Sequence, residues 1–470
     1  MPLPDLPIRE HLPVIAEVLA TAGRGVLLAP PGAGKTTLVP PSLLDAPWLD
    51  GRTILLLEPR RIAVRNAAHR IAALLGESVG ERVGYRMRGE TKLSRKTRIT
   101  VITEGILPGM LRRDPSIADV GLILFDEFHE RSLQVDLGLA LSLSCAELFR
   151  EDLRLLVMSA TLSPDPIARL LAEGTDRERM PVVESDGRIF PVETRYRASD
   201  PQRRLDENIA GAIRSVVAEE TEGDLLVFLP GRFEIMRTAE HLADLDATAD
   251  YDVLPLHGRL SSSDQDRALR PRSASAAARR IILATAIAES SVTIDGVRIV
   301  VDAGFTRLPR FDPSSGMTRL ETIRAPLSSV DQRRGRAGRL GPGICYRLWN
   351  PAEEQGFRLD ATPEIREADL LPLILEILGW GVSSDDLRWL DPPPLGPAEA
   401  ALSLGRDLGL VSEEGGLTDN GRAALAIPLH PRLAAMLLGS NAADLAQVAT
   451  LAALVEEGGP MRGGIERGSP

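Results

Sequence analysis

Residues 25–37 read GVLLAPPGAGKTT, a short apolar run followed by a glycine-rich loop and by residues that can begin a helix. A strand that feeds such a loop at a helix N-terminus is the usual setting of a phosphate-binding loop. The strict pattern GxxxxGK[ST] begins with glycine, whereas this chain has Ala29, the smallest alternative. The stretch therefore indicates either a nucleotide site or a mere glycine turn, and its surroundings must decide.

The same apolar runs recur on both sides of this loop and predict the fold class. From Gly25 to about Gly174 the runs GVLLA, TILLLE, RITVIT, GLILFDE and LRLLVMSA alternate with helical patterns. Strands that are apolar throughout and bracketed by helices indicate a parallel sheet covered on both faces. The runs DLLVFLP, DVLPLHG, RRIILATA, VRIVVDAG and GICYRLW predict a second such domain. Its first turn, FLPGRFEI, lacks Gly-Lys-Thr, so any nucleotide belongs to the first domain.

Proline-rich segments and changes in the hydrophobic pattern predict the domain boundaries. Proline-marked residues 179–201 read as a connection, residues 305–324 as two strands forming a protruding hairpin, and residues from Thr362 onward as helices with short turns. The pattern of the third part is compatible with a small winged-helix fold. We expect domains at residues 1–178, 179–360 and 361–428, followed by a helical segment at 429–470.

Bulk properties bound the class of protein. A length of 470 residues fits about three domains. Cys145 and Cys345 stand far apart in apolar surroundings, which indicates neither disulfide nor metal cluster. We see no signal peptide and no apolar run of about 18 residues, and so expect a cytoplasmic protein without membrane contact. A net charge of -11 counts weakly against nucleic acid as a partner. Local arginine clusters can still form a basic track, and they comprise Arg60, Arg61, Arg65 and Arg70 and then Arg333, Arg334, Arg336 and Arg339.

Two acidic residues end the strand GLILFDE and support the nucleotide reading. Asp126 and Glu127 arrive at the C-terminal end of a parallel strand, where ligands bind in such sheets. Asp126, with Thr36, is a candidate magnesium ligand, and Glu127 can take a proton from an attacking water. A solvated acidic loop is the alternative. The predicted phosphate cradle comprises Gly32, Ala33, Gly34, Lys35, Thr36 and Thr37.

The stretch QRRGRAGR, residues 332–339, places four arginines among glycines. Such a cluster repels itself unless an anion lies opposite, and a nucleotide phosphate in the other domain would supply one. An RNA-backbone patch or a solvated face remains the alternative.

Taken in order, these motifs resemble those of the DEAH-type superfamily 2 helicases. DEFH at residues 126–129 is similar to the family's second motif, with Phe128 in place of alanine. The other motifs follow in order as PRRIAV from Pro59, TEG at 103–105, SAT at 159–161, FLPGRFEI from Phe228, ATAIAESSVTIDG from Ala284 and QRRGRAGR. The resemblance runs from about Gly25 into the third domain. Ala286 replaces an asparagine of the best-known eukaryotic members, and Leu269 stands where an aromatic residue is expected to stack on the base. These departures look more like the bacterial HrpB-type branch.

The resemblance implies a fold and a set of residue roles. The fold would be two tandem RecA-like parallel α/β domains, a helical winged-helix segment and the start of a helical ratchet-like bundle. The implied catalytic residues are Glu127, His129, Gln332, Arg336 and Arg339, with Arg336 and Arg339 as arginine fingers and Gln332 positioning water. Arg70 and Asp295 would join the phosphate cradle in binding nucleotide, with Thr36 and Asp126 on the metal. RNA contacts would come from Arg60, Arg61, Thr103, Gly105, Gly231 and Thr293, and coupling from Ser159 and Thr161.

The implied function is an ATP-dependent RNA helicase that uses ATP and Mg²⁺ and moves 3′ to 5′ on RNA through sequence-independent backbone contacts. A DNA helicase or translocase is a second reading, since only 2′-hydroxyl contacts separate the two polymers. A non-hydrolysing RNA-binding scaffold is a third, although it would not need Glu127, Gln332, Arg336 and Arg339 together. Because HrpB-type chains continue through a full ratchet bundle and beyond, we expect this chain to be a truncated or unusually short version.

Overall fold

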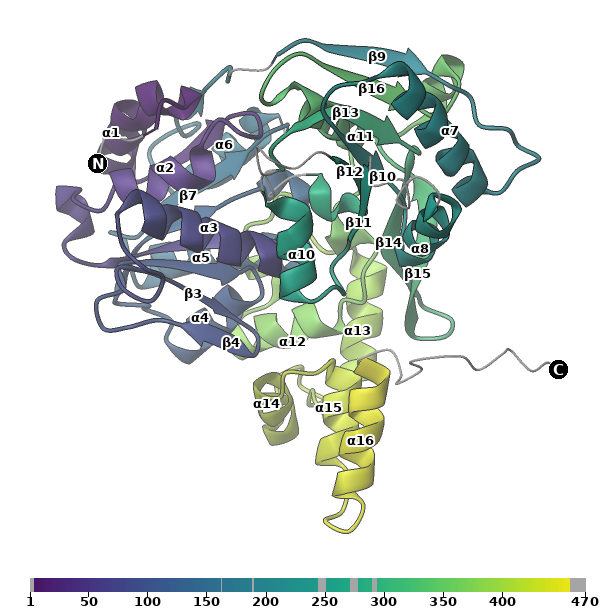
Figure 1. Ribbon diagram of the computed structural model, residues 1–470. Coiled ribbons are helices and arrows are strands. Elements are labelled where there is room, and N and C mark those ends of the chain that lie inside the picture. The colour runs from purple at the N-terminus through teal and green to yellow at the C-terminus, as the bar shows by residue number, and fades with distance from the viewer. Residues whose placement is uncertain are drawn as a thin grey trace.

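The computed structural model describes residues 4–161, 163–187, 190–243, 251–270, 278–289 and 294–456. Two α/β domains lie side by side, and the C-terminal helices lie beneath them (Figure 1). The two RecA-like domains and the helical C-terminal part confirm the predicted fold class.

The first domain is built on a mostly parallel sheet. Over the described ranges its strand order is β4-β3-β5-β2-β6-β7-β1-β8, and the β3–β4 pair alone is antiparallel. The strands are β1 (Arg24–Leu28), β2 (Thr53–Glu58), β3 (Val83–Met87), β4 (Glu90–Lys92), β5 (Ile99–Thr103), β6 (Val120–Phe125), β7 (Arg154–Ser159) and β8 (Val182–Glu184). The helices are α1 (Leu12–Thr21), α2 (Lys35–Ser42), α3 (Arg61–Leu74), α4 (Ile106–Arg113), α5 (Leu133–Leu148) and α6 (Pro164–Ala172). Every residue of β6 is buried, as expected for a strand covered on both faces.

The five strands predicted for this domain are all present. The short strands β3, β4 and β8 were missed. β8 lies in the segment that the sequence presents as a connection, and it pairs with β1, so the first sheet extends past residue 178. Pro40 and Pro41 lie in the last turn of α2, which ends at Ser42.

The second domain has a parallel sheet of its own. In the part of the chain that is described, its order is β11-β12-β10-β13-β16-β9. The strands are β9 (Val192–Tyr196), β10 (Asp224–Phe228), β11 (Tyr251–Leu256), β12 (Arg279–Ala284), β13 (Val297–Asp302) and β16 (Gly343–Arg347). The helices are α7 (Leu205–Glu219), α8 (Arg232–His241), α10 (Ser262–Leu269) and α11 (Leu327–Gly335), with the 3₁₀ turns η4 (Ala286–Ala288) and η5 (Arg336–Gly338). The predicted hairpin is confirmed as the antiparallel pair β14 (Phe305–Asp312) and β15 (Met317–Arg324).

The C-terminal part is helical and shares its core with the first domain. Its helices are α12 (Leu371–Trp380), α13 (Leu395–Asp407), α14 (Asp419–Ala426), α15 (Pro431–Leu438) and α16 (Leu445–Glu456). Leu371 and Leu375 of α12 belong to the same buried cluster as Phe125 of β6 and Leu137 of α5. A β-bridge between Val411 and Leu417 closes the glycine-containing turn between α13 and α14. Apolar burial therefore holds this part against the first domain rather than the second.

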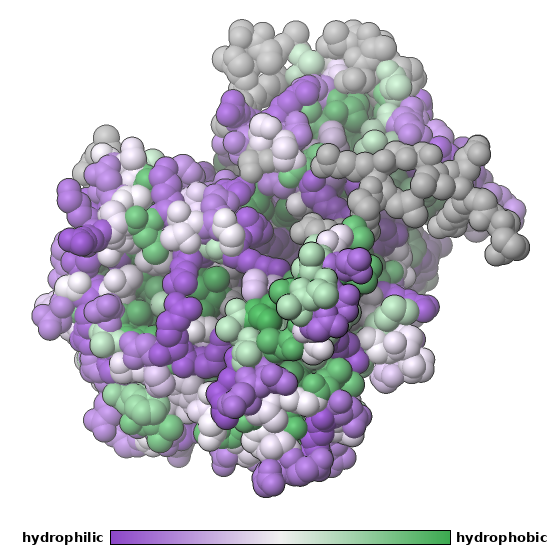
Figure 2. Space-filling model, turned by 90° about the horizontal axis from the view of Figure 1, so that it is seen from below, coloured by the Kyte–Doolittle hydropathy of each residue, from purple (hydrophilic) through white to green (hydrophobic). Residues whose placement is uncertain are grey.

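The last described helices project from the body of the molecule (Figure 1). Seen from below, apolar side chains lie between polar ones at this end (Figure 2), and Leu451 and Val455 of α16 are among the exposed apolar residues. None of the described helices is long and apolar enough to cross a membrane.

Candidate nucleotide site and nucleic-acid interface

The glycine-rich loop is held open by its backbone conformation. Gly32 and Gly34 have φ of 88° and 98°, a region that side-chain-bearing residues rarely adopt. Gly34 is the N-cap of α2, so the loop ends where helix amides point outward and anions bind. Ala29 donates its N–H to the Ser159 carbonyl at 3.0 Å, in ordinary strand-like fashion. Position 29 therefore needs no glycine.

Lys35, Asp126 and Glu127 meet at the base of this loop. The Lys35 Nζ lies 3.2 Å from Glu127 Oε2 and 3.8 Å from Asp126 Oδ1. The Thr36 hydroxyl donates to Asp126 Oδ2. All three charged side chains are buried, because β1 and β6 deliver them to the covered C-terminal edge of the sheet. The tertiary structure thus brings the two predicted motifs together.

Three carboxylates lie buried together at this edge of the sheet. Glu58, at the end of β2, is a third buried carboxylate beside Asp126 and Glu127. Burial raises the pKa of Glu127, but Lys35, His129 and Arg336 outweigh it and lower that pKa to about 2. Burial dominates at the other two, raising the pKa of Asp126 to about 6 and that of Glu58 well above its usual value. Two of the three carboxylates therefore have raised pKa values despite the cations nearby.

Backbone strain marks the loop that carries Glu127. Glu127 and Arg131 have φ of 49° and 47°, in the left-handed region. Such a conformation costs roughly 1–2 kcal/mol for a residue with a side chain. Arg131 is locked there by hydrogen bonds of 2.9 Å from its Nε and Nη2 to the two Asp136 oxygens. Residues held in this way are typical of functional sites, and in this backbone conformation the Glu127 carboxylate contacts Lys35.

Three of the four arginines of QRRGRAGR divide into two kinds, and the fourth, Arg334, is partly exposed beside Asp331. Arg333 is a structural residue, because its guanidinium lies 3.0 Å from both Asp302 Oδ1 and Glu289 Oε2 and is almost fully buried. Arg336 and Arg339 instead face the first domain. Burial, with the nearby Arg339 guanidinium, lowers the pKa of Arg336 well below its usual value. Burial also lowers the pKa of Arg339 to about 10. The second domain thus presents two guanidiniums toward the first domain.

Arg339 approaches the phosphate loop itself. A Cβ placed on Gly32 would lie 4.0 Å from Arg339 Nε. Gln332 reaches the first domain as well, its Nε2 donating to Thr161 Oγ1 at 3.4 Å. His129 accepts a hydrogen bond of 3.5 Å from the Ala160 N–H, which joins DEFH to SAT. Ser159 is the buried last residue of β7. The predicted catalytic and coupling residues therefore converge at the domain interface.

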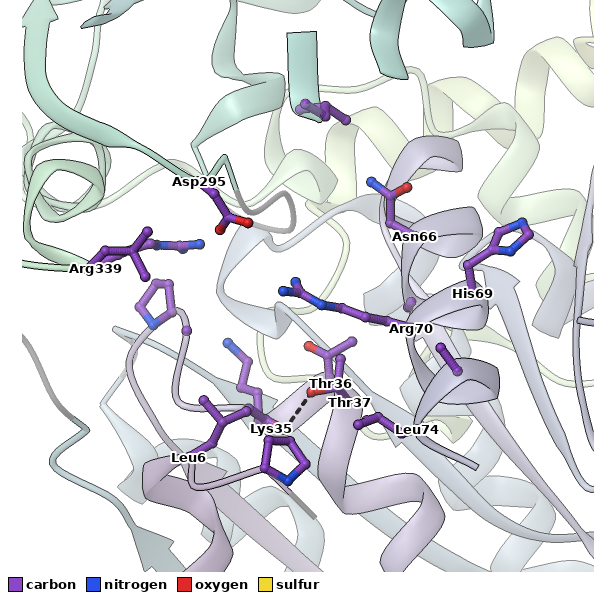
Figure 3. A pocket seen from close by; sticks show the side chains of 18 of the residues that line it. Leu6, Lys35, Thr36, Thr37, Asn66, His69, Arg70, Leu74, Asp295 and Arg339 are labelled. Carbon is purple, nitrogen blue, oxygen red and sulfur yellow. Dashed lines mark hydrogen bonds between the residues drawn. The ribbon is translucent and has the colours of Figure 1, made fainter. Parts of the chain in front are cut away.

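A cavity of about 1030 Å³ extends outward from these residues between the domains. Lys35, Thr36 and Thr37 lie at its base, Arg70 projects from α3 on one side, and Asp295 and Arg339 face it from the second domain (Figure 3). Leu269 lines the second-domain side, where the resemblance leads one to expect an aromatic residue.

The predicted RNA contacts are dispersed rather than gathered. Arg60 crosses to the second domain, where its Nη1 donates to the Ala286 and Ile287 carbonyls at 2.8 and 3.2 Å. Its Nη2 donates to Glu130 at 3.0 Å. A cavity of about 480 Å³ opens beside it, with Arg61 and Arg65 on the first-domain wall.

The remaining RNA candidates occupy loop positions. The half-exposed Arg61 donates to the Arg88 carbonyl at 2.6 Å. Thr103 ends β5 and Gly105 precedes α4. At Gly231, the N-cap of α8, a Cβ would lie 2.5 Å from Arg307 Nη1, so a side chain there would displace the Arg307 guanidinium of the neighbouring hairpin. Thr293 lies outside the described residues.

Sequence reasoning missed three contributors to the site. Glu58 carries the same signal as Asp126 and Glu127, because it is a carboxylate at the end of an apolar strand. Glu289 accepts from Arg333 with its side chain, while its carbonyl accepts from Arg336 Nε at 2.9 Å. Leu6, far outside every motif, lines the large cavity. Glu289 lies within the motif ATAIAESSVTIDG, but no local spacing shows that it contacts Arg333 and Arg336, and none connects Leu6 to the cavity.

Comparison with known proteins places this architecture in a family. Residues 11–170 match the model of the DEAD/DEAH box helicase domain, and residues 208–341 match that of the helicase conserved C-terminal domain. The chain belongs to the DEAD/DEAH box helicases. Within this family it is similar to the ATP-dependent RNA helicase HrpB of Escherichia coli, with 45% identity over 96% of this chain and 55% of the relative.

Other relatives and solved structures agree. A probable ATP-dependent RNA helicase of Mus musculus is 34% identical over 97% of this chain and 40% of its own length. The crystal structure of the Escherichia coli DEAH/RHA helicase HrpB superposes with a TM-score of 0.90 at 44% identity, over 98% of this chain and 57% of that one. The chain thus spans little more than half the length of its bacterial relative.

Proposed function

We propose that this chain is the motor of an ATP-dependent RNA helicase. The observation that carries the proposal is one cavity lined by Lys35 and Glu127 of the first domain and by Arg339 of the second. Asp126 lies beside Lys35, and the charge of Arg336 acts on Glu127 from the second domain. Carboxylates of the first domain thus lie opposite guanidiniums of the second. A nucleoside triphosphate with its metal ion would contact both sides at once.

Nucleotide binding would begin with an exchange of partners. Lys35 is paired with Glu127 in this structure, and the terminal phosphates would take Lys35 while the amides of residues 32–36 hold the phosphate oxygens. Glu127 would then be released from its ion pair and left ionised. In the ionised form it can accept a proton from the attacking water.

Thr36 and Asp126 are the residues that fit Mg²⁺. Both offer hard oxygen donors, and the surplus of buried carboxylate there calls for a cation. When bound, Mg²⁺ would neutralise charge on the phosphates.

Hydrolysis would depend on closure of the two domains. Arg336 and Arg339 would stabilise charge that develops on the phosphoryl group, an effect worth roughly 10³–10⁵ in rate for arginine fingers supplied in trans. Gln332, held by Thr161, would orient the water. Asp295 and Arg70 would flank the sugar and base.

RNA would act on the same closure. The predicted contacts lie on both domains, so a strand laid across them would favour the closed form and couple hydrolysis to movement, with 3′ to 5′ translocation as the expected direction. Arg60 is central because it already bridges the domains through Ala286 and Ile287. A phosphate would compete with these carbonyls for its guanidinium.

An ATPase titration with poly-rU, poly-dT and no polymer tests the proposal. We expect stimulation by RNA, which disappears in Lys35→Ala and Glu127→Gln, whereas Arg339→Ala keeps nucleotide binding and loses turnover. Equal rates with and without polymer would contradict the proposal, and equal stimulation by both polymers would favour a general nucleic-acid translocase. Unwinding of a 3′-tailed and a 5′-tailed duplex, measured in parallel, tests direction.

A further inference from the structure

The segment before α1 lies against the phosphate loop. We call residues Pro4–Ile8 the N-terminal strap. Ile8 is fully buried and its N–H donates to the Ala33 carbonyl, in the middle of the loop, at 3.1 Å. The strap precedes residue 11, where the match to the helicase domain model begins. It is joined to the loop by backbone and side-chain contacts alike.

The strap also fills the space beside Gly34. A Cβ at Gly34 would lie 2.8 Å from Leu6 Cδ1 and 3.2 Å from Ile8 Cγ2. These two side chains therefore touch the backbone of Gly34, which is the N-cap of α2 and has a φ of 98°. A glycine in an exposed loop samples many conformations, and packing of this kind removes most of them. The required conformation is thereby held by contacts from outside the loop.

The strap reaches the nucleotide cavity as well. Pro4 and Leu6 line it together with Pro31 and Lys35. Figure 3 shows Leu6 among the residues that line the site. The strap thus packs against the phosphate loop and also forms an apolar part of the cavity wall.

We propose that the N-terminal strap is part of the nucleotide-binding machinery, with Leu6 and Ile8 as positioning residues that hold the phosphate loop in its binding conformation before nucleotide arrives. The proposal rests on the nucleotide binding inferred above and assigns to this segment the control of affinity.

The physical reason is preorganisation. A glycine-rich loop samples many backbone conformations, and the two glycines make its ordering costly. If the loop holds the competent conformation only a fraction of the time, the apparent affinity falls by that fraction. Contacts from Leu6 and Ile8 raise the fraction without touching the reacting groups. Their loss should therefore affect binding and leave the chemical step unchanged.

Direct binding of Mg-ADP, followed with a fluorescent analogue, tests the strap in Leu6→Ala. We expect Kd to rise about tenfold, as for a loop competent about a tenth of the time. We expect kcat at saturating ATP to stay within about twofold, because Glu127, Arg336 and Arg339 are unchanged. Hydrogen exchange at the amides of residues 32–36 should quicken in the nucleotide-free variant.

Two variants serve as controls. Leu6→Met keeps the volume and should restore wild-type Kd, and Val14→Ala trims an exposed side chain on α1 and should have no effect. If Leu6→Ala fails to fold, Leu6→Val carries the test with an expected rise in Kd of about threefold. Wild-type Kd and exchange rates in the strap variant, or equal weakening in Val14→Ala, would overturn the proposal. Failure of the unaltered protein to bind Mg-ADP would overturn the proposed function itself.

Discussion

The assignment of Arg333 as a structural residue yields a sharp prediction for Arg333→Met. The substitution keeps an unbranched apolar side chain and removes the guanidinium that forms ion pairs with Asp302 and Glu289. Both N–O distances are 3.0 Å. Asp302 is fully buried, and burial already raises its pKa despite the contact with Arg333. Breaking a buried ion pair by removing one partner costs about 3–5 kcal/mol.

For a domain of this size, such a loss corresponds to a fall in Tm of roughly 6–20 °C. We expect this fall in the thermal unfolding of Arg333→Met. The Tm of Arg339→Met should lie within about 2 °C of wild type. Burial lowers the pKa of Arg339, which means that the folded protein does not stabilise its charged guanidinium.

A second substitution makes the reasoning refutable. Asp302→Asn on the Arg333→Met background removes the unpaired charge and should recover a large part of the loss. An Arg333→Met protein with unchanged Tm, or a double variant no more stable than the single one, would refute the account of Arg333 as counter-ion to Asp302. So would an equal loss in Arg339→Met.

Three further predictions follow from the same geometry. Burial raises the pKa of Glu104 from 4.5 to about 8, so the folded protein binds more protons than the unfolded chain between these pH values. The free energy of unfolding should therefore fall as pH rises through this range. Urea denaturation at pH 5 and pH 8 should show a smaller fall in Glu104→Gln. Arg60→Ala should weaken RNA binding uniformly across sequences and lower the salt slope by about 1, as read by fluorescence anisotropy, and an unchanged slope would leave Arg60 only as an interdomain contact. Gly34→Ala should abolish binding of Mg-ADP, because a side chain there is strained by the φ of 98° and lies too close to Leu6, and normal titration would contradict the account of the loop.

The local sequence determined which elements form and which residues carry chemistry. Apolar runs such as TILLLE and GLILFDE predict buried parallel strands because no polar face is needed when helices cover both sides. The glycine loop, Asp126 and Glu127 follow from short patterns whose chemistry is local. β8 was missed because three residues in a proline-marked segment carry too little periodicity.

Only the tertiary structure decided how these parts meet. The stretch QRRGRAGR does not show which of its four arginines are catalytic. In the folded chain Arg333 pairs with Asp302 and Glu289, whereas Arg336 and Arg339 face the first domain. Arg60 lies next to Arg61 in sequence, yet one crosses to η4 and the other turns toward the Arg88 carbonyl. The strap illustrates the same limit, since Leu6 and Gly34 carry no pattern that pairs them. Contacts between distant segments depend on burial and shape in the folded chain, which no local spacing encodes.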